Sequence, residues 1–148
     1  MKKFIPLVAG FLLGLSNPAK AEVYKYRELN AGMSGLNPIG NYHNPFPGAS
    51  YLKSTVHTNN LLFFETQFGI ALPTILTMKV CTGLDFDTVR LSLGFRFWPA
   101  TYGPQIEIKS KNKSIIMSYE ISAPGDFPFS NHHLITLGVR WKPRIIRL

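Results

Sequence analysis

The chain has 148 residues, with 16 basic and 8 acidic side chains and a formal net charge of +8 at pH 7. Its single cysteine, Cys81, excludes an intramolecular disulfide and a zinc site with the usual paired cysteines. A basic chain can suit a nucleic-acid partner, but no recognised nucleic-acid motif occurs, so no such partner is expected. The length suits one domain.

The first 21 residues have the three parts of a secretory signal peptide. The chain begins with two lysines after the methionine, residues 4–15 are apolar, and residues 19–21 read A-K-A, an A-x-A cleavage pattern. The apolar run is shorter than the roughly 20 residues of a membrane helix. We therefore expect residues 1–21 to be removed, leaving residues 22–148 as one domain with a short basic tail. A buried N-terminal helix is the alternative.

Glycine, proline and asparagine divide the remaining chain into short runs that alternate between apolar and polar residues. Several such runs at regular spacing are typical of an all-β sandwich or barrel. We expect eight strands, at residues 22–30, 49–58, 61–72, 74–82, 88–98, 105–110, 113–122 and 132–142. The connecting loops and turns are expected at residues 31–48, 58–60, 83–87, 99–104, 111–112 and 123–131, and at Pro73. If the first two runs are not strands, a six- or seven-stranded open sheet is the alternative.

The clearest run is residues 88–98, which read T-V-R-L-S-L-G-F-R-F-W. Its bulky apolar residues all fall on one face of an extended chain, and Arg90, Ser92, Gly94 and Arg96 fall on the other. A helix would distribute the arginines around every side. The run is about as long as a tilted strand that crosses a bilayer, roughly 9–11 residues.

Alternation does not say which face points into a barrel. A soluble barrel turns its apolar face inward, whereas a membrane barrel turns it toward lipid. The interior of an eight-stranded barrel is just wide enough for side chains to fill. The polar face carries many small residues between its charges, and small residues suit a crowded lumen. We therefore expect the polar face inside and the bulky apolar face toward lipid.

Because an unpaired buried charge is very costly, charges in this lumen must pair. We expect the arginines to bond bidentately to Glu65, Glu107 and Glu120, which would plug the pore; ordinary solvated surface charge is the alternative. The expected lumen charges are Glu65, Lys79, Arg90, Arg96, Glu107, Lys109, Glu120 and Arg140. The residues expected to face lipid are Phe64, Phe68, Leu91, Leu93, Phe95, Phe97, Ile135, Leu137, Val139 and Trp141.

The signal peptide, the strand at residues 88–98 and the closing run H-L-I-T-L-G-V-R-W together resemble small bacterial outer-membrane β-barrel proteins. The likeness covers most of residues 22–148 but is one of pattern, and it indicates no single family. It implies an antiparallel up-and-down β-barrel of about eight strands, located in the outer membrane and in contact with membrane lipid. Periplasmic or secreted location is the alternative.

The chain offers little that points to catalysis. His43, His132 and His133 would share one rim, where a metal site is conceivable, and His57 would lie near the other. Some barrels of this size modify lipid A, but the His-x-Ser pair expected of a deacylase is missing. The nearest nucleophile, base and acid are Ser130, His132 or His133, and Asp126, crowded into one loop. We assign no catalytic residue, metal ligand or cofactor.

The expected function is therefore that of a small outer-membrane barrel with a filled lumen, acting structurally or through its surface loops. Residues 31–48 and 123–131 are the loops that could contact a surface partner, because loops on a rigid scaffold often carry function. Two alternatives remain open. One is an exported soluble barrel that binds an apolar ligand inside, and the other is a barrel enzyme that acts on lipid.

Overall fold

The structure is a computed structural model. It describes residues 22–36, 46–59, 61–72, 74–97, 100–122 and 133–142, so the predicted signal peptide and basic tail lie outside the described residues. These residues form eight strands: β1 (Glu22–Leu36), β2 (Phe46–Asn59), β3 (Leu62–Leu72), β4 (Ile75–Asp85), β5 (Val89–Phe97), β6 (Ala100–Lys109), β7 (Lys113–Ser122) and β8 (His133–Trp141).

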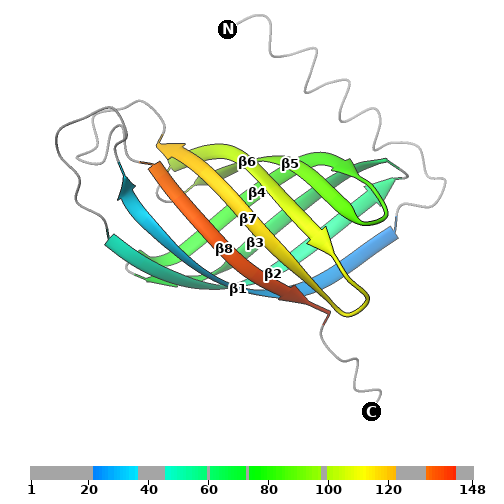
Figure 1. The fold of residues 1–148 in the computed structure, drawn as a ribbon, viewed down its shortest axis with the longest axis horizontal. Coiled ribbons are helices and arrows are strands. Elements are labelled where there is room, and N and C mark those ends of the chain that lie inside the picture. Colours follow the sequence, from blue (N-terminus) through cyan, green and yellow to red (C-terminus); the bar gives the residue numbers. More distant parts are fainter. Residues whose placement is uncertain are drawn as a thin grey trace, which may run out of the picture.

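The eight strands form one closed antiparallel barrel in which each strand pairs with its neighbours in sequence. β8 pairs with β1 and closes the barrel, from Arg27 opposite Trp141 to Met33 opposite Ile135 (Figure 1). The predicted all-β, up-and-down barrel of eight strands is therefore confirmed. Among the residues that the structure describes, no helix is long and apolar enough to cross a membrane.

The strand register gives the barrel a fixed stagger. Stepping between Cα partners from Glu22 around the barrel returns to β1 at Gly32, ten residues further along. Such a stagger accompanies strands tilted typically by about 35–45° from the barrel axis. The steps pass through Thr58, Phe63, Gly83, Ser92, Gln105, Ser118 and Thr136.

Two predicted loops are partly or wholly strand. β1 continues to Leu36 and β2 begins at Phe46, so only residues 37–45 of the predicted loop at 31–48 lie outside the strands and the described residues. The predicted loop at 99–104 is wrong from residue 100 onward, because β6 begins there. Hydrogen bonding from both neighbouring strands outweighs the weak local preference of glycine and proline, a common outcome for β-propensity.

Other strand boundaries differ from the prediction by a few residues, also because of pairing with neighbouring strands. β4 extends to Asp85, into the predicted turn at residues 83–87, because these residues pair with β5. The β6 ladder also tolerates Pro104, which lacks an amide donor. On the β7 side, pairs run to Tyr102 and resume at Gln105, so the proline falls in the interval between them.

The polarity of the barrel is inverted relative to a soluble protein. Among the described residues, seventeen polar or charged ones are buried, against five hydrophobic ones. The outer wall instead carries most of the large apolar side chains, including Leu93 at 67% exposed and Ile70 at 61%. β5 shows this alternation throughout, with Arg90, Ser92 and Arg96 buried between exposed leucines and phenylalanines. The apolar face therefore points out of the barrel.

Closure between the first and last strands can be tested by cross-linking. Leu29 and Val139 are Cα partners on the outer wall, and partners across a β ladder lie within disulfide range. With Cys81→Ser as background, the pair Leu29→Cys and Val139→Cys should oxidise to an internal disulfide that changes mobility on a non-reducing gel. The control pair Leu29→Cys and Leu93→Cys, on β1 and β5, should not. Equal cross-linking of both pairs would contradict the closed barrel.

Candidate functional site

The candidate site is a group of ten charged side chains inside the barrel. Strand alternation turns each of them inward from a wall of seven strands, and their ion pairs join them into clusters. Five are acidic and five are basic, so the group is formally neutral. The acidic residues are Glu28, Glu65, Asp85, Glu107 and Glu120, and the basic residues are Lys79, Arg90, Arg96, Lys109 and Arg140.

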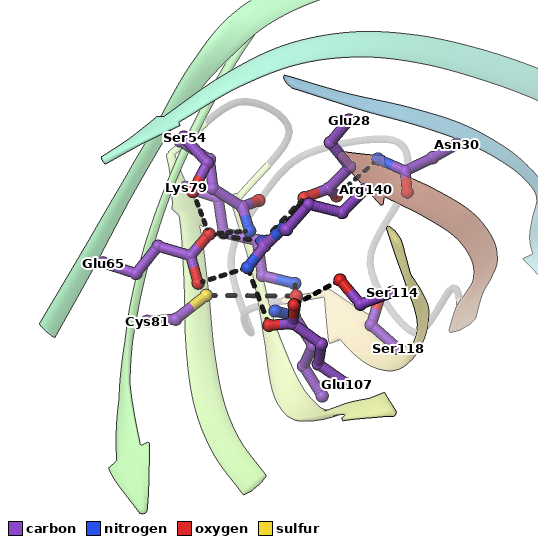
Figure 2. Close-up of polar contacts among 12 residues, drawn as sticks. Glu28, Asn30, Ser54, Glu65, Lys79, Cys81, Glu107, Ser114, Ser118 and Arg140 are labelled. Atoms are coloured by element: carbon purple, nitrogen blue, oxygen red, sulfur yellow. Dashed lines mark hydrogen bonds and ion pairs between the residues drawn. The ribbon is translucent and has the colours of Figure 1, made fainter. Parts of the chain in front are cut away.

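Arg140 is the centre of the largest cluster and is fully buried. Figure 2 shows its guanidinium between the carboxylates of Glu28, Glu65 and Glu107. Nη2 donates to Glu28 Oε2 at 2.7 Å and Nη1 donates to Glu107 Oε2 at 2.8 Å, while Glu65 accepts from both of these nitrogens. The ring of Tyr26 lies below the guanidinium, 5.4 Å from its centroid. One arginine therefore links β8 to β1, β3 and β6.

The carboxylates around Arg140 also accept hydrogen bonds from neutral residues. The hydroxyl of Ser114 donates to Glu107 Oε1 at 2.5 Å, and Ser54 donates to Glu65. The Gln67 amide donates to Glu65 Oε1 at 2.9 Å. These bonds satisfy carboxylate oxygens that the single arginine cannot satisfy alone, which a buried ion cluster requires.

Glu120 is the centre of a second cluster. Arg96 grips it bidentately, with Nε donating to Oε2 at 2.8 Å and Nη2 to Oε1 at 2.9 Å. Lys79 Nζ donates to Glu120 Oε1 and to Gln105 Oε1, both at 2.7 Å. The hydroxyl of Thr101 completes the shell at 2.5 Å from Oε2. Two cations share one carboxylate here, which offsets the surplus of carboxylates around Arg140.

Arg90 joins a third cluster to the first. Its Nη2 donates to Asp85 Oδ2 and its Nη1 to Glu107 Oε2, both at 2.8 Å. Lys109 Nζ also donates to Asp85, at 2.5 Å. The Arg90 guanidinium lies 4.7 Å from the ring centroid of Phe63, a cation–π contact with a buried aromatic ring.

Small residues make room for the long ones. A Cβ atom added to Gly94 would lie 2.3 Å from Lys79 Cε, so a larger residue there would force the lysine side chain to shift. Lys79 then reaches from β4 to Glu120 on β7. The interleaving of glycine with charge in the sequence is therefore a packing requirement of the narrow interior.

All eight charged residues predicted for the lumen lie inside the barrel, seven of them buried and Lys109 partly exposed near the rim. The structure brings them together with two acids that the sequence reading missed. Glu28 was missed because β1 has weak alternation at its start, and Asp85 because it fell in a predicted turn. Phe63 was also missed, since its inward position breaks the apolar-out pattern.

All ten residues predicted to face lipid lie on the outer wall. Eight of them are exposed, whereas Phe64 and Trp141 are half-buried on the same face. The soluble alternative needs these side chains inside the barrel, around a ligand. The structure puts charged groups there instead.

Cavities enter the barrel from both ends. One of about 420 Å³ lies at the end of the barrel with the short β2–β3, β4–β5 and β6–β7 turns, which we call the short-turn end. It is lined by Tyr26, Asp85 and Arg90, among others. A smaller one of about 90 Å³ is lined by Asn30, Arg96 and neighbours. These two cavities share no lining residue. Arg96 of the Glu120 cluster lines the smaller one, and Arg140 and Glu107 line a further cavity of about 170 Å³.

The histidines do not assemble into a site among the described residues. His57 lies in β2 and His133 begins β8, at the opposite end of the barrel, where the Tyr119 hydroxyl contacts its Nδ1. In the part of the chain that the structure describes, no three His, Cys, Asp or Glu residues are grouped to hold a metal ion. His43, His132, Ser130 and Asp126 lie outside the described residues.

The chain matches no protein-family model and no curated protein sequence. Among solved structures it is similar to the crystal structure of Neisserial surface protein A, with a TM-score of 0.45 and 16% sequence identity. The match covers 82% of this chain and 99% of that one.

Replacing Arg140 should be the most damaging single change in the network. Arg140→Ala leaves Glu28, Glu65 and Glu107 without their shared cation, and breaking a buried pair in this way costs about 3–5 kcal/mol. Unfolding by urea in detergent micelles, followed by tryptophan fluorescence, measures the loss.

Lys109→Ala is the matched control for Arg140→Ala, because Lys109 is partly exposed and Asp85 keeps Arg90 as a partner. Its effect should stay below about 1 kcal/mol. Arg140→Lys should fall between the two, since an ammonium cannot reproduce the planar fork of a guanidinium. Equal losses in Arg140→Ala and Lys109→Ala would contradict a central role for Arg140.

Proposed function

We propose that the chain is exported to the bacterial outer membrane and forms a small transmembrane barrel with a closed lumen. In this proposal it is not an enzyme and acts structurally or through its surface loops. The observation that carries the proposal is the inverted polarity, with large apolar side chains on the outer wall and seventeen polar residues buried inside. A soluble monomer rarely exposes so continuous an apolar surface.

Strand length also supports a membrane location. The strands contain between 9 and 15 residues, and a tilted strand needs about 9–11 to cross a bilayer. A closed barrel leaves no strand edge whose backbone groups would lie unpaired in lipid. The predicted signal peptide, with its A-x-A site, would supply the route of export.

The ion clusters support a closed lumen. Arg140 and Glu120 each bind partners on three other strands and so cross the interior at the middle of the barrel. An open channel through the barrel would require these ion pairs to separate, and separating buried charges is costly in a low-dielectric interior. We therefore expect no open channel of the porin kind.

The two longest connections support a role at the surface. Residues 37–45 join β1 to β2 and residues 123–132 join β7 to β8, and these four strands are contiguous in the barrel. The strand ends they join lie at one end, where His133 is a Cα partner of both Leu36 and Ile121. The described ends of these four strands therefore lie together in the wall, and loops on a rigid scaffold often carry function.

Membrane fractionation with heated and unheated gel samples is the direct test. A folded barrel in the outer-membrane fraction should migrate differently before and after boiling, because its closed ladder resists detergent until heated. A protein that appears in the periplasm without a mobility shift would contradict the proposal and favour the soluble alternative.

Cysteine labelling should locate the lipid-facing wall. In a Cys81→Ser background, Leu93→Cys should resist a charged, membrane-impermeant maleimide in intact vesicles, because lipid covers that position. Lys111→Cys, in the turn between β6 and β7, should react from the side on which the turn is exposed. Rapid labelling of both positions would contradict insertion, while folding of each variant is checked by its mobility shift.

A further inference from the structure

The apolar outer wall carries charge in one region only. Among the outward-facing positions of the described strands, the charged residues are Lys25 and Arg27 on β1, Lys53 on β2 and Lys113 on β7. All four are basic and exposed. We call them the basic patch.

The four residues are neighbours across the barrel seam. Arg27 is the Cα partner of Lys53 on one side and of Trp141 on the other, and Trp141 is in turn the partner of Lys113. Lys25 lies two residues from Arg27 on the same face of β1. The patch is therefore a continuous row across β7, β8, β1 and β2, with Trp141 in its middle.

No acidic side chain of the described chain balances the patch. Five of the acids are held in the lumen, and the other two described are Glu22 at the start of β1 and Asp87 in the β4–β5 turn. No described residue forms an ion pair with Lys25, Arg27 or Lys53. Arg27 and Lys53 lie directly opposite each other on the sheet, and like charges in that position repel. The row is therefore arranged to receive an anion from outside the chain.

The patch lies toward the short-turn end of the barrel. Lys113 is the first residue of β7, Trp141 is the last of β8, and Arg27 is five residues into β1. A tilted strand rises about 2.5 Å along the barrel axis per residue. Arg27 is then about 12 Å from that end, close enough for its long side chain to reach the headgroup region.

The surroundings select a lipid rather than a water-soluble anion. Leu29 and Val139 flank the patch on the outer wall and are exposed, as is Phe68 beside Lys53. Tryptophan favours the membrane interface, where Trp141 would lie. A phosphate among the cations, with acyl chains along these apolar side chains, would satisfy both parts of the surface.

We propose that the basic patch binds the phosphate-bearing headgroup of an anionic phospholipid, in the leaflet at the short-turn end of the barrel. This inference rests on the proposed membrane location, and it adds a specific lipid class and a site. In outer-membrane barrels the short turns face the periplasm, so the leaflet concerned is the inner one. Phosphate recognition by lysine and arginine needs no further group here.

The test uses the full barrel, freed of lipid in a neutral detergent and titrated with phosphatidylglycerol or phosphatidylcholine. Native mass spectrometry counts the lipids that remain bound. The wild-type barrel should prefer phosphatidylglycerol, and the triple variant Lys25→Gln, Arg27→Gln, Lys53→Gln should lose about tenfold or more of that preference. The matched control, Lys111→Gln, Arg144→Gln, Arg147→Gln, removes the same charge elsewhere and should keep it.

Two results with the variants would overturn the assignment: an unchanged preference for phosphatidylglycerol in the patch variant, or an equal loss of that preference in the control. Two others would overturn it by pointing to a different ligand: displacement of the lipid by inorganic phosphate alone, or patch-dependent binding of polyglutamate without a lipid preference. The charge-conserving variant Lys25→Arg, Lys53→Arg should retain the preference, which guards against a folding defect. The gel mobility shift of every variant is recorded in parallel, so failure of the barrel to insert is distinguishable from failure to bind lipid.

Discussion

The structure depends on charge neutrality inside a space too narrow for bulk water. Five carboxylates and five cations share the barrel interior, and Arg140 alone joins β8 to three other strands. Replacing a buried ion cluster by apolar groups is often neutral or stabilising, so the network is not a simple source of stability. The network instead fixes the strand register, because each ion pair forms only when the strands pair in that one register. Glu28 and Arg140 are separated by 112 positions in the chain and meet only when β1 and β8 close the barrel.

The apolar wall and the polar lumen are two sides of the same alternation. Successive residues of a strand point to opposite faces, so packing Arg90 and Arg96 inside forces the intervening Leu91, Leu93 and Phe95 outside. A protein in water would have to reverse this order to bury its apolar surface. The barrel instead suits an apolar environment, where exposed apolar side chains carry no free-energy penalty. Its closure leaves no strand edge with unpaired backbone groups.

The basic patch is the one departure from this division of the described strands. Its cations lie on the apolar side, around the seam where the first and last strands meet, and none of them forms an ion pair with another described residue. The charges of the lumen are compensated internally, whereas those of the patch are left for an external anion. The same residue types therefore serve two purposes, and the difference between them is only which face of a strand they occupy.

The strands differ in how well the sequence predicted their bounds and their buried charges. The alternation in residues 88–98 and 113–122 was strong enough to place β5 and β7 almost to the residue. Alternation along β3 to β8 together placed the eight predicted charged side chains on one face. β6 was shortened because Gly103 and Pro104 look like a loop when read locally. Glu28 was missed for a similar reason, since its strand is defined less by its own residues than by its two partners.

The sequence by itself determined which residues share a face, because a period of two is a local property of the backbone. Alternation alone could not determine which face points inward, since it is symmetric between the two; that expectation came from the small residues on the polar face and the narrow interior of an eight-stranded barrel. The sequence also could not pair Arg140 with Glu28, Glu65 and Glu107 rather than with Glu120. Those pairings follow from the ten-residue stagger of the closed barrel, which sets the height at which each side chain meets the others. That stagger is a property of eight strands joined in a ring, and only the tertiary structure contains it.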